Sequence, residues 1–125
     1  MTLPPDELKA VAEVVYPELH PRLVHDSDLV FLKHKLVPDE LGRYTGGLKE
    51  EQIWFNPSLT GTERERAQAC DVIVAASKLK NFHLMIWPDG FSIEYTDEYG
   101  NERATTPLTP DILTAAMRAI LEAGK

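Results

Sequence analysis

The side chains best suited to hold a metal ion or to act as a nucleophile are few and scattered. The four histidines are His20, His25, His34 and His83, and no two of them have the spacing that places two ligands on one face of a helix. The single cysteine, Cys70, lies in the apolar run 69–76, where nothing in the local sequence supplies the base or cation that activates a thiol. We therefore expect no metal site and no cofactor, and we expect Cys70 to be a buried packing residue.

Other catalytic patterns are also missing from the sequence. The glycine-rich stretch 42–47 lacks the lysine and serine that end a phosphate-binding loop, and no G-x-S-x-G nucleophile elbow occurs. Twenty acidic residues offer many carboxylate pairs, so no single pair indicates acid–base catalysis. The sequence predicts a protein that is not an enzyme. A deep cleft lined by His83, Trp87 or Tyr95 would instead favour a small enzyme or a ligand-binding domain.

One stretch combines acidic and aromatic side chains. Residues 89–102 include five acidic residues and no lysine or arginine, interleaved with three aromatic residues. Aromatic side chains are frequent anchors at protein interfaces. We therefore interpret Asp97, Glu98 and Tyr99 as candidate partner-binding residues that would dock on a basic protein surface. The alternative is a solvated turn whose aromatic side chains pack inward.

Length, composition and charge limit the classes of function. A chain of 125 residues fits one domain, 1–125, with a core that needs no metal or disulfide to fold. The net charge of −7 disfavours nucleic-acid binding, because phosphate contacts need clustered lysine and arginine. No apolar stretch approaches the ~18 residues of a membrane span, and the N-terminus lacks the features of a signal peptide. We expect a cytoplasmic protein that binds neither nucleic acid nor membrane.

Three segments have the apolar periodicity and the end signals of helices. The first covers residues 4–19 and opens with two prolines, which suit a first helical turn. Pro17 and Pro21 predict that this helix frays or ends near Tyr16. The second covers residues 60–79 and begins with two overlapping S/T-x-x-E capping boxes, at Thr60 and at Thr62. In the third, Thr109 is the expected N-cap and a proline follows it at the first helical position.

Extended segments fall on both sides of the middle helix. Before it, the pattern predicts a hairpin over residues 22–34 with its turn at 26–28, a loop over 38–47 and a short strand over 51–55. After it, strict alternation across a Pro-Asp-Gly turn predicts an antiparallel hairpin over 81–96, with a short edge strand over 102–105. The order α-β-β-β-α-β-β-α predicts an α+β fold with a single, mainly antiparallel sheet covered by two to three helices. A parallel crossover through the middle helix is the alternative.

This order of elements, together with several short motifs, resembles a group of small phage and prophage proteins. The stretch 53–60, Ile-Trp-Phe-Asn-Pro-Ser-Leu-Thr, ends a strand and leads into a capped helix. The hairpin over 82–95 and a closing alanine-rich helix follow, and the openings over 8–13 and 16–19 are also similar. The resemblance implies a small accessory protein, made during infection or from a prophage, that binds a host protein in the bacterial cytoplasm. It implies no catalytic residues.

These features leave three hypotheses for the function. The leading one is a non-catalytic accessory protein of phage type that binds a host or viral protein, as an acidic inhibitor would. The second is a small enzyme or ligand-binding domain with an unfamiliar pocket. The third is a structural component that assembles into homo-oligomers.

Overall fold

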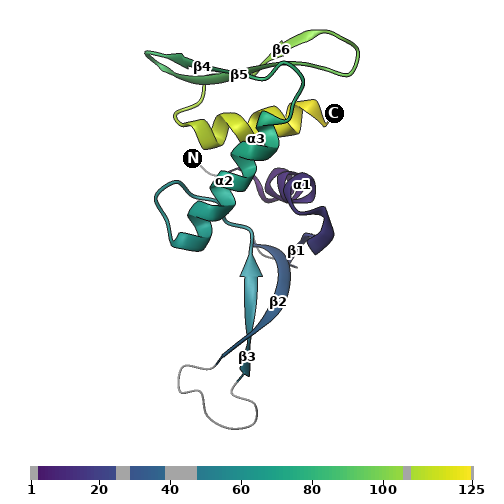
Figure 1. Ribbon diagram of the computed structural model, residues 1–125, viewed down its shortest axis with the longest axis vertical. Coiled ribbons are helices and arrows are strands. Elements are labelled where there is room, and N and C mark those ends of the chain that lie inside the picture. The colour runs from purple at the N-terminus through teal and green to yellow at the C-terminus, as the bar shows by residue number, and fades with distance from the viewer. Residues whose placement is uncertain (1–2, 25–28, 39–47, 106–107, 125) are drawn as a thin grey trace.

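The computed structural model describes residues 3–24, 29–38, 48–105 and 108–124 of the chain. Over these residues the chain forms three α-helices and two separate three-stranded antiparallel sheets. Figure 1 shows the helices in the middle of an elongated molecule, with one sheet across one end and a long hairpin at the other. The predicted α+β class and order of elements are confirmed. The prediction of one sheet was wrong.

The first helix ends where proline forces it to end. α1 spans Pro5–Val15, and its last carbonyls are capped by the backbone N–H of Tyr16, which donates to Ala12. Tyr16 itself has non-helical backbone angles, because a following proline disfavours the helical region. A short 3₁₀ turn, Pro17–Leu19, follows. The end of this helix near Tyr16, predicted from the prolines, is therefore confirmed.

The first sheet is a hairpin with a short third strand. β1 (Arg22–Leu23) pairs with β2 (Val30–Pro38), which pairs with β3 (Leu48–Trp54), all antiparallel. The register shifts by one residue just after Phe31. Both long strands exceed their predictions, since the pairing of β2 with β3 extends into the segment expected to be a loop. The predicted turn at 26–28 and residues 39–47 of that loop lie outside the described residues.

The middle helix separates the two sheets. α2 spans Glu63–Ser77 and begins at Thr62 with a complete capping box, in which Thr62 and Glu65 satisfy each other's backbone N–H groups, so this prediction is confirmed. A helix of 15 residues is about 22 Å long. The strands before and after α2 therefore lie at opposite ends of the helical layer (Figure 1), so the described strands form two sheets and none of them pairs in parallel.

The exposed position of Cys70 corrects the expectation of a buried thiol. The residues of α2 that face the core are Gln68, Ala69, Val72 and Ala76. With about 3.6 residues per turn, this buried stripe leaves Cys70 on the solvent side of the helix. Because most residues of the run 69–76 are apolar, more than one side of this helix could face the core, and the composition alone did not determine which side is buried.

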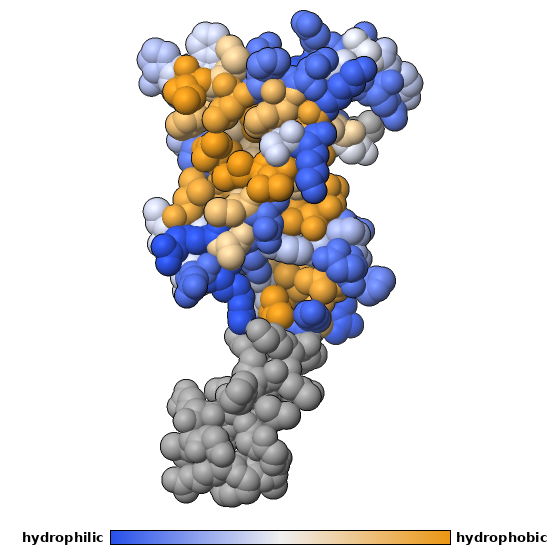
Figure 2. Space-filling view, viewed as in Figure 1, coloured by the Kyte–Doolittle hydropathy of each residue, from blue (hydrophilic) through white to orange (hydrophobic). Residues whose placement is uncertain are grey.

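The second sheet lies at the far end of the molecule. β4 (His83–Trp87) and β5 (Gly90–Thr96) form the predicted hairpin, with Pro88 and Asp89 as the two turn residues, and β6 (Glu102–Ala104) pairs with the other side of β5. Gly90 has φ of 153°, a value that residues other than glycine rarely adopt. Figure 2 shows hydrophilic side chains over the end where β5 and β6 lie.

The last helix begins two residues later than predicted. α3 spans Ile112–Ala123, and its N-cap is Asp111, whose carboxylate accepts the Thr114 N–H at 2.7 Å. Thr109, the expected N-cap, instead exchanges two backbone hydrogen bonds with Phe91 at 2.8 and 2.9 Å. Strand pairing therefore takes Thr109 out of the helix.

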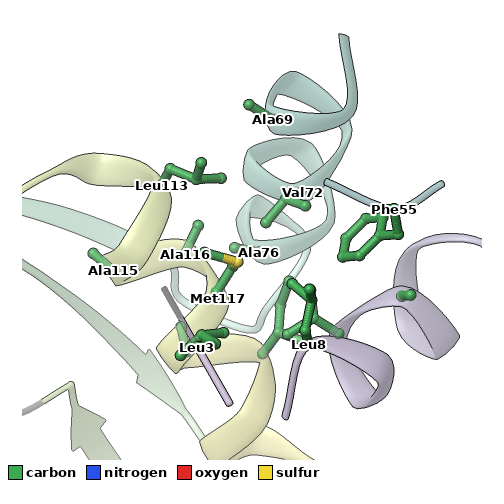
Figure 3. Packing of buried hydrophobic residues seen from close by; sticks show 14 of the residues in the cluster. Leu3, Leu8, Phe55, Ala69, Val72, Ala76, Leu113, Ala115, Ala116 and Met117 are labelled. Atoms are coloured by element: carbon green, nitrogen blue, oxygen red, sulfur yellow. The ribbon is translucent and has the colours of Figure 1, made fainter. Parts of the chain in front are cut away.

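α3 lies between the second sheet and the other two helices, and the core is built around it. It contacts α1, α2 and β5. Figure 3 shows Val72 and Ala76 of α2 on the side that faces Ala116 and Met117 of α3. On the sheet side, Ile93 and Tyr95 of β5 are 1% and 3% exposed. The alanines of α3 let all these neighbours approach its backbone closely.

Enlarging one of these alanines should destabilise the fold. Ala116 is fully buried, so Ala116→Leu must displace close-packed neighbours and should lower the free energy of unfolding by about 1–3 kcal/mol. Ala123→Leu, at the exposed end of the same helix, should change it by less than about 0.5 kcal/mol. Urea unfolding followed by circular dichroism compares the two. Equal stabilities would contradict the packing described above.

Tyr16 joins the end of α1 to α2. Its hydroxyl donates to the Asp71 carboxylate at 2.5 Å, and its ring meets Phe55 edge-on at 5.9 Å between centroids. Burial, and then the hydrogen bond to Asp71, raise the pKa of Tyr16 well above its ordinary value. The folded state therefore favours the neutral phenol.

Removing this hydroxyl should reduce stability at neutral pH but not at high pH. Tyr16→Phe keeps the ring packing and loses the hydrogen bond, so the free energy of unfolding should fall by about 1 kcal/mol at pH 7. Because the pKa is raised on folding, the hydrogen bond stabilises the protein below about pH 10 and this stabilisation is lost as the pH rises further. Urea unfolding from pH 7 to 11 should show the two proteins converging. A constant difference would contradict this role of Tyr16.

Candidate protein-binding surface

The turn between β5 and β6 is held together by Asp97. One carboxylate oxygen of Asp97 accepts the backbone N–H groups of Tyr99 and Asn101, each at 2.9 Å, and the other accepts Arg103 Nε at 2.9 Å. The N–H donated by Asn101 and the Arg103 side chain are the main causes that lower the pKa of Asp97. Asp97, predicted as a partner-binding residue, therefore has its carboxylate engaged within the turn.

The other two predicted residues project from the same turn. Tyr99 is 80% exposed, the largest exposed fraction among the big hydrophobic side chains of the described chain, and Glu98 is also exposed. Gly100 follows Tyr99 and closes the turn with φ of 84°, a backbone conformation that glycine adopts readily. The turn thus presents one aromatic ring and one carboxylate to solvent on a backbone that Asp97 fixes. Their role in binding stays a prediction.

The remaining aromatic residues of the acidic stretch point the other way. Phe91 and Tyr95 alternate with Ser92 and Glu94 along β5, and they pack against the core on the side of α3. Burial raises the pKa of the Tyr95 hydroxyl. The two interpretations of this stretch therefore apply to different residues, since its strand aromatics pack inward and its turn aromatic is exposed.

The face of the second sheet opposite α3 carries both acidic and apolar side chains. By alternation from the buried Ile93, the residues on this outer face are His83, Met85, Trp87, Ser92, Glu94, Thr96, Glu102 and Ala104. Trp87 is 47% exposed, and its indole N–H donates to Ser92 Oγ at 3.0 Å, which fixes the ring on the sheet. Residues 83–104, which form the sheet and its turns, contain five acidic residues and one arginine, and two of the acids, Glu94 and Glu102, lie on this face.

A small hollow on this sheet is the nearest feature to the cleft that an enzyme would need. It has a volume of about 280 Å³ and is lined by Asn81, His83, Glu94, Tyr95, Thr96 and Glu102. Sites for drug-sized ligands usually exceed about 300 Å³. His83 Nδ1 lies 2.8 Å from the Asn81 carbonyl, and Trp87 does not line the hollow. Among the described residues, no three histidine, cysteine or acidic side chains are placed to hold a metal ion.

Two larger hollows adjoin each other where α1, α2 and β3 meet. Their volumes are about 470 and 440 Å³, and both are lined by Leu8, Asn56 and Glu65. The polar groups there have structural partners. The carboxylate of Glu65 accepts the Thr62 N–H and the Asn56 amide, hydrogen bonds that lower its pKa, and Asp111 caps α3. These hollows therefore do not gather polar groups around a common point, as a catalytic site would.

The composition of residues 89–102 predicted the turn residues as candidates, but it did not indicate the exposed sheet face beside them. The structure places Trp87 on the outer face of the sheet, where it is 47% exposed. The feature of the sequence that indicates this face is the alternation of residues 83–87, which puts Met85 and Trp87 on the same side of the strand. Only the position of α3 decides which side of that strand is covered.

Comparisons with known proteins complete the description. Neither protein-family models, nor curated proteins, nor solved structures gave a match to this chain. In the described part of the chain, every helix is too short or too polar to cross a bilayer.

Removing the Asp97 carboxylate should loosen the turn without unfolding the protein. In Asp97→Ala, the amides of Tyr99 and Asn101 lose their acceptor and should exchange with solvent faster, whereas Glu98→Ala should leave them unchanged. The folded-state pKa of Asp97 is lowered, so acidification of the native protein through that pKa should produce the same loss of protection. Amide exchange measured by NMR tests both expectations. Unchanged protection in Asp97→Ala would contradict the role assigned to this carboxylate.

Proposed function

We propose that this protein is a non-catalytic accessory protein of phage or prophage type that acts in the bacterial cytoplasm by binding a basic surface of another protein. The binding surface consists of the outer face of the β4–β6 sheet and the adjoining turn, and we call it the acidic sheet surface. The observation that carries the proposal is the combination of exposed aromatic rings, Tyr99 and Trp87, with a concentration of negative charge on one sheet.

The geometry suits a preformed contact. Tyr99 stands on a turn closed by Asp97, and Trp87 is hydrogen-bonded to Ser92, so binding would order few additional groups. Aromatic rings give a large contact area at a low entropic cost. β5 has seven residues and is about 20 Å long. Both rings therefore fit within one interface of ordinary size, about 800 Å² on each partner.

The charge of the surface indicates the chemistry of its partner. Glu94, Glu98 and Glu102 lie on or beside the sheet, and Arg103 is engaged by Asp97. An acidic surface attracts a basic one over distances up to the Debye length, about 8 Å at physiological salt, and accelerates association. Binding should therefore weaken as the salt concentration rises.

The test is capture of a partner by the tagged protein and by surface variants. Tyr99→Ala and Glu98→Lys should each reduce capture of the same protein from a bacterial lysate at least about 10-fold, the effect of losing an interface anchor worth about 1.4 kcal/mol. Leu59→Ala and Glu18→Lys change an exposed apolar residue and an exposed acid elsewhere, and they should leave capture unchanged. Circular dichroism verifies that all four variants fold.

Two results would contradict the proposal. One is capture that is insensitive to both surface variants, which would place the contact elsewhere. The other is a partner bound equally well at low and high salt, because that result removes the electrostatic attraction on which the choice of a basic partner depends.

A further inference from the structure

β4 is an open edge of the second sheet. It pairs with β5 on one side, and no described strand pairs with its other side. Soluble proteins usually protect such edges with charged residues, bulges or very short strands. β6, at the opposite edge of this sheet, has three residues, of which two are charged. β4 has five residues, none of them acidic, lysine or arginine, and its register with β5 is continuous.

The hydrogen-bonding groups at this edge can be assigned from the partners of β5. The Ile93 C=O accepts the Thr105 N–H and the Ile93 N–H donates to Thr105 Oγ1, while Phe91 exchanges two backbone hydrogen bonds with Thr109, all on the side away from β4. The residues opposite them on β4 are Leu84 and Ile86. When a residue of an antiparallel pair directs its N–H and C=O groups away from its partner strand, the residue opposite it does the same. Leu84 and Ile86 therefore direct these groups away from β5 and offer four backbone groups at the open edge.

The side chains at the edge are apolar, and one of them is uncovered. Ile86 is 72% exposed, the largest exposed fraction among the large aliphatic side chains whose burial the structure describes. By alternation it lies on the same face as Leu84, which packs against the core, but α3 does not extend over it. Burying such a side chain would contribute about 1.5–3 kcal/mol. A strand added to this edge would cover Ile86.

We propose that two copies of this chain pair through their β4 edges, antiparallel, about a two-fold axis at Met85. In that register Leu84 lies opposite Ile86 of the second copy, and the two exchange both N–H···O hydrogen bonds. Met85 lies opposite Met85, and the aromatic pair His83 and Trp87 face each other at both ends. The two sheets become one six-stranded sheet.

Two properties of the strand favour a second copy as the occupant. β4 has an odd number of residues, and its outward-facing positions are symmetric about the central one, so it is complementary to itself, as a two-fold interface requires. The charges beyond its ends also match. The turn residue Asp89 of one copy would lie beside Lys80 of the other, and symmetry produces this pair of opposite charges twice.

The proposed dimer does not depend on the proposed function. If both hold, the dimer adds a second acidic sheet surface to the assembly. The acidic sheet surface lies on the faces of the strands, and the pairing uses an edge, so both surfaces remain open in the dimer. Two such surfaces on one rigid sheet would bind a repeated or dimeric partner with a higher avidity than one copy.

A cysteine at the two-fold axis tests the register directly. The mutant Met85→Cys is made in a Cys70→Ser background, because Cys70 is exposed. Opposite residues in a non-hydrogen-bonded pair have Cα atoms about 4.5 Å apart, within the range that a disulfide spans. Glutathione disulfide should therefore oxidise the two thiols to an intermolecular disulfide, with glutathione taking up the two electrons and two protons. His83→Cys in the same background faces Trp87 and should stay monomeric on a non-reducing gel.

Light scattering at about 100 µM, where a micromolar complex is formed, gives an independent test. The wild-type protein should have twice the 14.1 kDa mass of one chain. Ile86→Lys, which places a charge at the edge of each copy, should have the single-chain mass and an unchanged circular dichroism spectrum. Val74→Lys, at an exposed position of α2, should remain dimeric.

Several outcomes overturn the proposal. They are a wild-type protein with the mass of one chain, an Ile86→Lys variant that stays dimeric, a Val74→Lys variant that becomes monomeric, and cross-linking of His83→Cys as efficient as that of Met85→Cys.

Discussion

The structure depends on burying α3 on almost every side. Ala115, Ala116 and Ala119 have no exposed surface, and the elements that cover this helix come from the start, the middle and the end of the chain. A helix that is apolar on two opposite faces is stable only between two layers. Here α1 and α2 provide one layer and the β4–β6 sheet provides the other. The small alanine side chains let both layers pack at short distance, so neither can be lost without exposing α3.

This arrangement determines which surfaces remain for function. One face of the second sheet packs on α3, and the other face, which carries Trp87, Glu94 and Glu102, is left to solvent. The hydrogen bonds that the Asp97 carboxylate accepts from the Tyr99 and Asn101 N–H groups extend the order of the sheet into the turn that carries Tyr99. On the other side of the helical layer, Gln68 links α2 to the end of β3 by accepting the Asn56 N–H and donating to the Trp54 carbonyl, both at 2.7 Å. The helical layer and the second sheet therefore hold the exposed, charged surface in a fixed conformation.

Much of the local structure could be predicted from the sequence because short-range rules govern it. The capping box at Thr62 and the alternation across Pro88 and Asp89 specify their elements within a few residues. The errors arose where distant contacts decide. Thr109 has the chemistry of an N-cap, but pairing with Phe91 occupies its backbone. The exposure of Cys70 and the separation into two sheets depend on which face and which end of α2 meet the rest of the chain. The turn residues of the candidate surface were recognisable from charge and aromatic content, whereas the internal role of Asp97 requires the position of Arg103.

The central claim is that α3 and the β4–β6 sheet form one cooperative unit, so that the acidic sheet surface is preformed. Native-state hydrogen exchange, resolved by residue with NMR over a series of low urea concentrations, tests this claim most directly. We expect the amides of Ile93, Ala116 and Ile120 to exchange with the same free energy, equal to that of global unfolding. Exchange at Ile93 that is several kcal/mol easier than exchange in α3 would show that the sheet opens separately from the helix, and would contradict the account.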